Sequence, residues 1–124
     1  MIRKALTVTV AALVLGAAST PALTMERKGN LAVQFAGERN WVADCTVTKS
    51  DGKELKVSRR GRGNRSVKSI GIRAISGGSC TLTVPEGTTL KVSFNSTGTI
   101  PCPFDSNDPC VDYFMKPGAH TFSF

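Results

Sequence analysis

The sequence predicts a small, exported all-β protein: one antiparallel β-sandwich, or partly open barrel, of about seven to eight strands with two disulfides. Three observations predict this class. Short segments of alternating apolar and polar residues recur roughly every eight to twelve positions, with turn residues between them. The chain contains four cysteines, an even number. Its first residues have the composition of a secretory signal peptide.

The N-terminal segment predicts export. Arg3 and Lys4 precede an uncharged run rich in Ala, Val and Leu, and small residues follow that run. This order of a basic region, an apolar region and small residues is typical of a signal peptide. The apolar run is shorter than the roughly 20 residues that span a bilayer, which argues against a membrane anchor. We predict cleavage after Ala22, in preference to Ala18, so that residues 1–22 form the signal peptide.

Cleavage leaves one predicted domain, residues 23–124, which we expect to be secreted or periplasmic. Of the 16 basic residues in the chain, Arg3 and Lys4 are lost with the signal peptide, which leaves 14 basic against nine acidic residues. The domain therefore has a net charge of about +5. No other apolar stretch is long enough to cross a membrane.

All four cysteines, Cys45, Cys80, Cys102 and Cys110, lie in the predicted domain. In a small exported chain such a set is typical of disulfides. Three pairings are possible, but the short loop rich in Pro and Asp favours Cys102 with Cys110, which leaves Cys45 for Cys80. The chain has no CxxC motif and a single histidine, His120. We therefore predict no metal site and no cofactor.

Eight segments carry the strand pattern, and no stretch of the predicted domain has a convincing helical periodicity. Each segment is short, alternates apolar with polar residues, and is bounded by Gly, Pro, Asn, Asp or Ser. The predicted strands are 31–35, 41–49, 53–59, 67–75, 79–84, 88–94, 110–115 and 119–124.

Matching of apolar residues predicts the register of the first hairpin. A two-residue turn would set apolar residues opposite polar ones, whereas a three-residue loop, 50–52, pairs Val47 with Leu55 and Cys45 with Val57. A shift by one residue moves every side chain to the other face of the sheet, so we predict the longer loop. Its last residue is a glycine, at the position that requires a positive φ.

The same reasoning predicts a second hairpin with a three-residue loop, 76–78, that again ends in glycine. In this register the apolar residues of the two strands face one another, and Cys80 points into the core as Cys45 does. The predicted pairs are Ile70 with Val84, Ile72 with Leu82 and Ala74 with Cys80.

The predicted meander divides the loops between two ends of the domain. Both loops that end in glycine, and the long 95–109 connection, lie at one end. The 60–66 loop, the 85–87 turn and the approach to Trp41 lie at the other. We therefore expect the basic 60–66 loop and the acidic 95–109 loop at opposite ends.

Residues 58–66 read SRRGRGNRS, and the segment 49–73 holds nine of the 16 basic residues, opposed only by Asp51 and Glu54. Arginine binds phosphate, sulfate or carboxylate groups with planar, paired hydrogen bonds. We therefore predict a non-enzymatic protein that binds an anionic polymer or an acidic protein surface. The candidate ligand-binding residues are Lys56, Arg59, Arg60, Arg62, Arg65 and Lys68.

Two alternatives concern the same loop. A solvated hairpin tip has the same composition of Arg, Gly, Asn and Ser. A secreted inhibitor or toxin-like effector would present the loop to another protein. Inhibitor loops are usually held rigid, because preorganisation lowers the cost of binding. Here the nearest cysteines are 14 or more residues from the arginines, and two glycines loosen the loop.

Two further alternatives lie elsewhere in the chain. Asp105, Asn107 and Asp108 supply oxygen ligands of the kind that Ca²⁺ prefers, but Pro109 stands where a calcium loop would continue. An enzyme would need a general base, and no carboxylate or nucleophile is spaced to partner His120. The sequence favours a binding protein over both.

Overall fold

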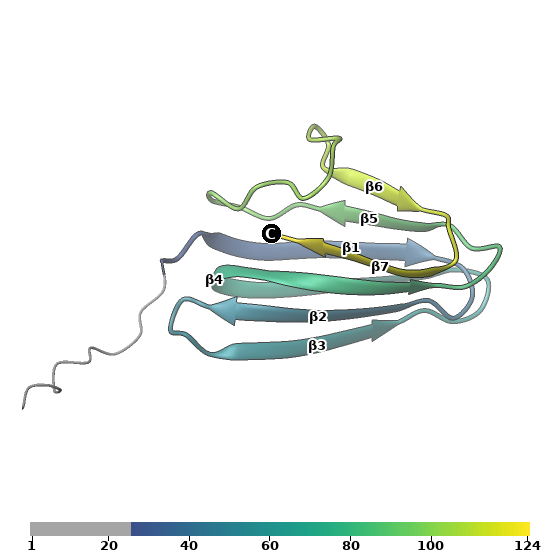
Figure 1. The fold of residues 1–124 in the computed structure, drawn as a ribbon, viewed down its shortest axis with the longest axis horizontal. Coiled ribbons are helices and arrows are strands. Elements are labelled where there is room, and N and C mark those ends of the chain that lie inside the picture. The colour runs from purple at the N-terminus through teal and green to yellow at the C-terminus, as the bar shows by residue number, and fades with distance from the viewer. Residues whose placement is uncertain (1–25) are drawn as a thin grey trace, which may run out of the picture.

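The computed structural model describes residues 26–124, which fold into seven antiparallel strands and contain no helix (Figure 1). Within this range nothing has the form of a membrane-spanning helix. The predicted signal peptide lies outside the described residues. The strands are β1 (Gly29–Gly37), β2 (Val42–Lys49), β3 (Glu54–Arg60), β4 (Ser66–Val84), β5 (Leu90–Phe94), β6 (Val111–Phe114) and β7 (Gly118–Ser123).

The strands form one hydrogen-bonded sheet in the order β3-β2-β4-β1-β5-β6, with β7 also paired to β4. The first arm of β4, residues 66–75, pairs with β1, and the second arm, residues 75–84, pairs with β2 and β7. Figure 1 shows β4 turning back on itself between these arms. The sheet is thereby folded into two layers, one of β3, β2, the second arm and β7, the other of the first arm, β1, β5 and β6.

Local backbone features produce the reversal of β4. Ala74 has a φ of +54°, which is uncommon for a residue other than glycine. The register slips near this point against both β1 and β2, as a β-bulge requires. A Cβ atom added at Gly78 would lie 2.6 Å from the carbonyl oxygen of Thr46 and 3.0 Å from the ring of Phe124. Glycine at this position therefore allows the second arm to approach its neighbours closely.

The prediction of a hairpin at residues 76–78 is wrong. The segments predicted on its two sides are arms of one continuous strand, and Ile70 pairs with Val33 of β1. The chain does reverse its direction, but the arms belong to different layers and face each other across the core. The predicted pairs that do not form are Ile70 with Val84, Ile72 with Leu82 and Ala74 with Cys80.

The predicted register of the first hairpin is confirmed. Cys45 pairs with Val57 and Val47 pairs with Leu55. Gly52 closes the loop with a φ of +88°. The alternation of apolar and polar residues was sufficient here because β2 and β3 are neighbours both in sequence and in the sheet.

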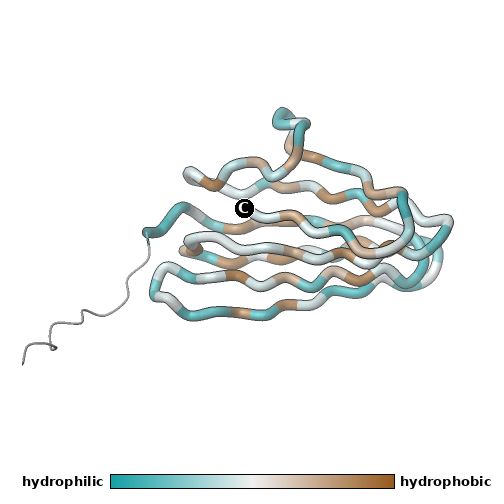
Figure 2. The backbone as a smooth tube through the Cα atoms, viewed as in Figure 1, coloured by the Kyte–Doolittle hydropathy of each residue, from teal (hydrophilic) through white to brown (hydrophobic). Residues whose placement is uncertain are grey.

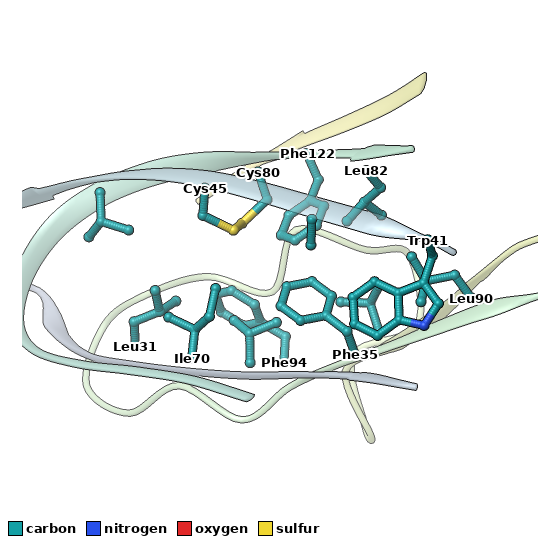
Figure 3. Packing of buried hydrophobic residues seen from close by; sticks show 14 of the residues in the cluster. Leu31, Phe35, Trp41, Cys45, Ile70, Cys80, Leu82, Leu90, Phe94 and Phe122 are labelled. Carbon is teal, nitrogen blue, oxygen red and sulfur yellow. A yellow bond between two sulfur atoms is a disulfide. The ribbon is translucent and has the colours of Figure 1, made fainter. Parts of the chain in front are cut away.

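The core lies between the two layers, where side chains of alternate residues meet (Figure 3). Hydrophobic and hydrophilic residues alternate along the strands (Figure 2). Burial of each large apolar side chain stabilises the fold by about 1.5–3 kcal/mol. Both predicted disulfides are present: Cys45–Cys80 joins directly opposed residues of β2 and β4, and Cys102–Cys110 closes the loop before β6. The largest fully buried apolar side chains are Leu31, Phe35, Trp41, Ile70, Ile75, Leu82 and Leu90.

The loops gather at two ends, as the sequence predicted. The strand registers place the 95–109 loop and the 60–66 loop at opposite ends of the sandwich. We call the end with the reversal of β4 and the Cys102–Cys110 loop the disulfide end. We call the other the arginine end, formed by residues 37–41, 60–65, 85–89 and 115–117.

Close packing at Gly78 can be tested by substitution. Gly78→Ala should lower the free energy of unfolding by about 1–3 kcal/mol, because the new methyl group collides with the Thr46 carbonyl. Gly71→Ala is the control on the same strand, since no atom lies within 4 Å of a Cβ added there. It should change stability by less than about 0.5 kcal/mol. Urea unfolding measures both, and equal stabilities would contradict the packing described.

Candidate anion-binding site

The structure gathers three of the six predicted binding residues and separates the others. Arg60, Arg62 and Arg65 are exposed at the arginine end. Lys56 is exposed farther along β3, opposite Thr46 of β2. Lys68 is exposed on the first arm of β4. Only the three arginines therefore share one loop and its margin.

Arg59, the sixth residue, connects the two layers. Its Nε atom donates to the carbonyl oxygen of Ser69 at 2.9 Å, and a terminal nitrogen donates to the carbonyl of Ser58 at 2.9 Å. Because β3 and the first arm of β4 are edge strands of different layers, the bond to Ser69 joins the layers along their open side. The guanidinium of Arg59 thus has structural partners that the sequence did not reveal.

The backbone of the arginine loop is held in place by hydrogen bonds. The amide of Gly61 donates to the carbonyl of Trp41 at 2.9 Å. The amide of Arg62 donates to the hydroxyl of Ser66 at 2.7 Å, and this hydroxyl donates to the Arg62 carbonyl at 2.6 Å. A third bond joins the carbonyl of Gly63 to the β1–β2 turn at 2.8 Å. These bonds fix the main chain and leave the arginine side chains exposed.

The arginine end carries an excess of positive charge. Within residues 26–124, no ion pair neutralises any of its basic side chains. The disulfide end, in contrast, has nearly balanced charge, because Asp105, Asp108 and Asp112 offset basic residues near the β2–β3 turn. The charged residues of the arginine end are Arg39, Arg60, Arg62, Arg65, Lys116, Glu38 and Glu86.

One open depression at this end lies beside the single tryptophan. It is lined by Asn40, Trp41, Val42, Arg60, Gly61 and Arg62. Trp41 has no exposed surface. Its Nε1 is the one buried side-chain nitrogen or oxygen in residues 26–124 without a hydrogen-bond partner. Such an unpaired donor costs about 1–3 kcal/mol.

Two glycines make room for the indole. A Cβ atom added at Gly61 would lie 1.9 Å from Trp41 Nε1, and one added at Gly37 would lie 3.1 Å from Cδ1. Figure 3 shows the indole nitrogen on the side away from the Cys45–Cys80 disulfide. The polar edge of the indole therefore lies directly under the arginine loop.

A second depression combines residues that are far apart in the sequence. Arg65, Lys91 and Tyr113 line it, and Lys91 and Tyr113 lie opposite each other on β5 and β6. Tyr113 is 54% exposed, unlike the aromatic residues of the core. No sequence signal connects these positions to the arginine loop, since their proximity depends on the order of strands in the sheet.

The remaining candidate residues are those considered for metal binding and for catalysis. In the described range no group of three or more His, Cys, Asp or Glu side chains is placed to hold a metal ion. Asp105 and Asp108 are exposed in the Cys102–Cys110 loop. A ring nitrogen of His120 lies 2.6 Å from the carbonyl of Lys116, and its ring packs on Phe114 with centroids 5.3 Å apart. His120 thus helps to fix the β6–β7 turn.

Comparison of this chain with protein-family models, with curated proteins and with solved structures gave no significant match. Its function therefore has to be argued from the geometry and the charge of the arginine end.

The link made by Arg59 predicts different effects for neighbouring arginines. Arg59→Ala should lower the free energy of unfolding by about 1 kcal/mol, because two carbonyl groups lose a charged donor. Arg60→Ala removes the same charge from an exposed side chain and should cost less than about 0.5 kcal/mol. Urea unfolding at fixed salt compares the two variants. If Arg60→Ala lowers the free energy of unfolding as much as Arg59→Ala does, the hydrogen bond from Arg59 to Ser69 does not stabilise the contact between the layers.

Proposed function

We propose that this domain is an exported, non-enzymatic binding protein that captures an anionic polymer through its arginine end. The observation that carries this proposal is the arrangement of Arg60, Arg62 and Arg65. Their side chains are exposed, and no carboxylate of the described chain pairs with them. Their loop is fixed by hydrogen bonds to Trp41 and Ser66.

Three physical effects support binding at this end. Phosphate, sulfate and carboxylate groups accept paired hydrogen bonds from the planar guanidinium group. A fixed loop has less conformational entropy to lose when a ligand binds, so more of the interaction energy contributes to affinity. The excess charge at one end also attracts an anion and orients it before contact.

Lys68 and Lys56 would extend the binding surface along the two edge strands, and Arg59 would contribute mainly by holding these strands together. The ligand class therefore has to be long enough to contact several cations, as a phosphate- or sulfate-bearing polymer is. Acidic protein surfaces share this property. The two disulfides are in keeping with the oxidising compartments outside the cytoplasm, where we propose that the protein acts.

A heparin column tests the proposal. A variant with Arg60, Arg62 and Arg65 changed to Ala should elute at a clearly lower salt concentration than the wild type, because three phosphate- or sulfate-binding groups are lost. The matched control changes Lys49, Lys53 and Arg73 to Ala. It removes the same charge near the disulfide end and should elute close to the wild type. Equal shifts of the two variants would show that net charge, and not the arginine end, determines retention.

The hydrogen bonds of the loop also favour the second candidate, a secreted inhibitor or toxin-like effector. They supply part of the rigidity that the sequence did not predict for this loop. The response to salt separates the two candidates. Binding of a polyanion weakens log-linearly with salt, with a slope of about 0.7–0.9 for each neutralised phosphate. Binding to a protein through a complementary shape depends on salt much less.

A further inference from the structure

The buried indole N–H of Trp41 has no role in the proposal above. Nε1 is enclosed and makes no hydrogen bond with any residue of the range 26–124. Unpaired buried donors are rare in folded proteins, and each one requires an explanation. The position of this donor, beneath the arginine loop, suggests that its acceptor belongs to a ligand.

The side chains around the depression share one chemical property. Arg60 and Arg62 line it together with Trp41, and all three offer N–H donors. No carboxylate lines the depression; Asn40 supplies its one side-chain oxygen. A site with an excess of donors and of positive charge selects an anion with several acceptor atoms.

We propose that Trp41, Arg60 and Arg62 form a subsite for one tetrahedral oxyanion, that is, a phosphate or sulfate group. The indole donor is buried beneath Gly61, whereas the side chains of Arg60 and Arg62 are exposed, so the donors lie at different depths. A tetrahedral group directs its oxygens to all of them, whereas a planar carboxylate has two oxygens. This inference rests on the proposed function and names the group of the polymer that the arginine end recognises.

Access to the indole depends on Gly61. The near contact of Gly61 with Nε1 means that an oxyanion reaches this nitrogen only when Gly61 moves aside. Glycine makes such a movement easy, and Gly63, two residues later, already has a φ of +69°. The Gly61 amide, bonded to the Trp41 carbonyl, keeps the loop attached while the indole edge is uncovered. Oxyanion binding thus changes the surroundings of a core side chain.

The single tryptophan provides a direct measurement. The ¹H–¹⁵N spectrum of the folded domain contains one indole resonance, because Trp41 is the sole tryptophan. We expect the indole proton to move downfield, with saturation, when inorganic phosphate or sulfate is added. Sodium chloride at the same ionic strength and sodium acetate should leave it in place. The anion of lower Kd indicates whether phosphate or sulfate esters are the natural ligands.

Three results would overturn the subsite. The indole proton does not move with either oxyanion, moves equally with chloride or acetate, or is already strongly downfield without any oxyanion. The last result would show that a water molecule already accepts this bond. Retention on heparin is a separate measurement, so arginine-dependent retention with an unmoved indole resonance refutes the subsite and leaves the proposed function intact. A saturable indole shift without arginine-dependent retention refutes capture of a polymer.

Substitutions of Arg60 and Arg62 test whether these two side chains bind the oxyanion. Arg60→Gln and Arg62→Gln should each raise the Kd for the oxyanion about tenfold or more, because each removes a charged donor. Lys116→Gln is the matched control at the same end, since Lys116 is exposed and does not line this depression. It should change the Kd by less than about threefold, through distant charge alone. An equal loss of affinity in all three variants would mean that the ion is held only by the general charge of the loop.

Discussion

The reversal of β4 is the constraint on which the rest of the structure depends. A single strand supplies one arm to each layer, so the same few residues decide how the layers face each other and which strands become neighbours. Because the chain turns at the disulfide end, the β1–β2 turn, the arginine loop and the 85–89 turn all gather at the opposite end. The position of the arginines is thus a consequence of the bulge, of Ala74 and of Gly78 at the disulfide end of the sandwich.

The core and the charged end are joined through Trp41. Its indole fills the space between the layers near Phe35, with ring centroids 6.0 Å apart, and its carbonyl holds the loop that carries the arginines. Both features that lower stability, an unpaired buried donor and an excess of like charge, occur within a few residues of this side chain. Departures from optimal packing and pairing are expected where a surface has been shaped for binding.

The sequence predicted what local patterns determine. The register of Val47 with Leu55 follows from alternation along neighbouring strands. The two disulfides follow from the even number of cysteines and the short loop that pairs Cys102 with Cys110. The sequence correctly predicted that the chain reverses near residues 76–78, but the predicted hairpin was wrong. A glycine-rich segment allows a hairpin and a turn between layers equally well. The partners of Arg59 and the unpaired Nε1 of Trp41 depend on contacts between layers. The alternation of apolar and polar residues along a strand does not predict such contacts.

The strand order has a consequence for the time course of folding. Of the described strands β1 comes first in the chain, yet it lies between β4 and β5 and pairs with no strand that immediately follows it. Only β2 and β3, and later β5 and β6, form hairpins from neighbouring segments. Synthesis proceeds from the N-terminus, so β1 is made before its partners. Its apolar face therefore stays uncovered until residues beyond the midpoint of the chain have been made. Non-local pairing of this kind slows folding and exposes strand edges, so we expect the local β2–β3 hairpin to form early in folding.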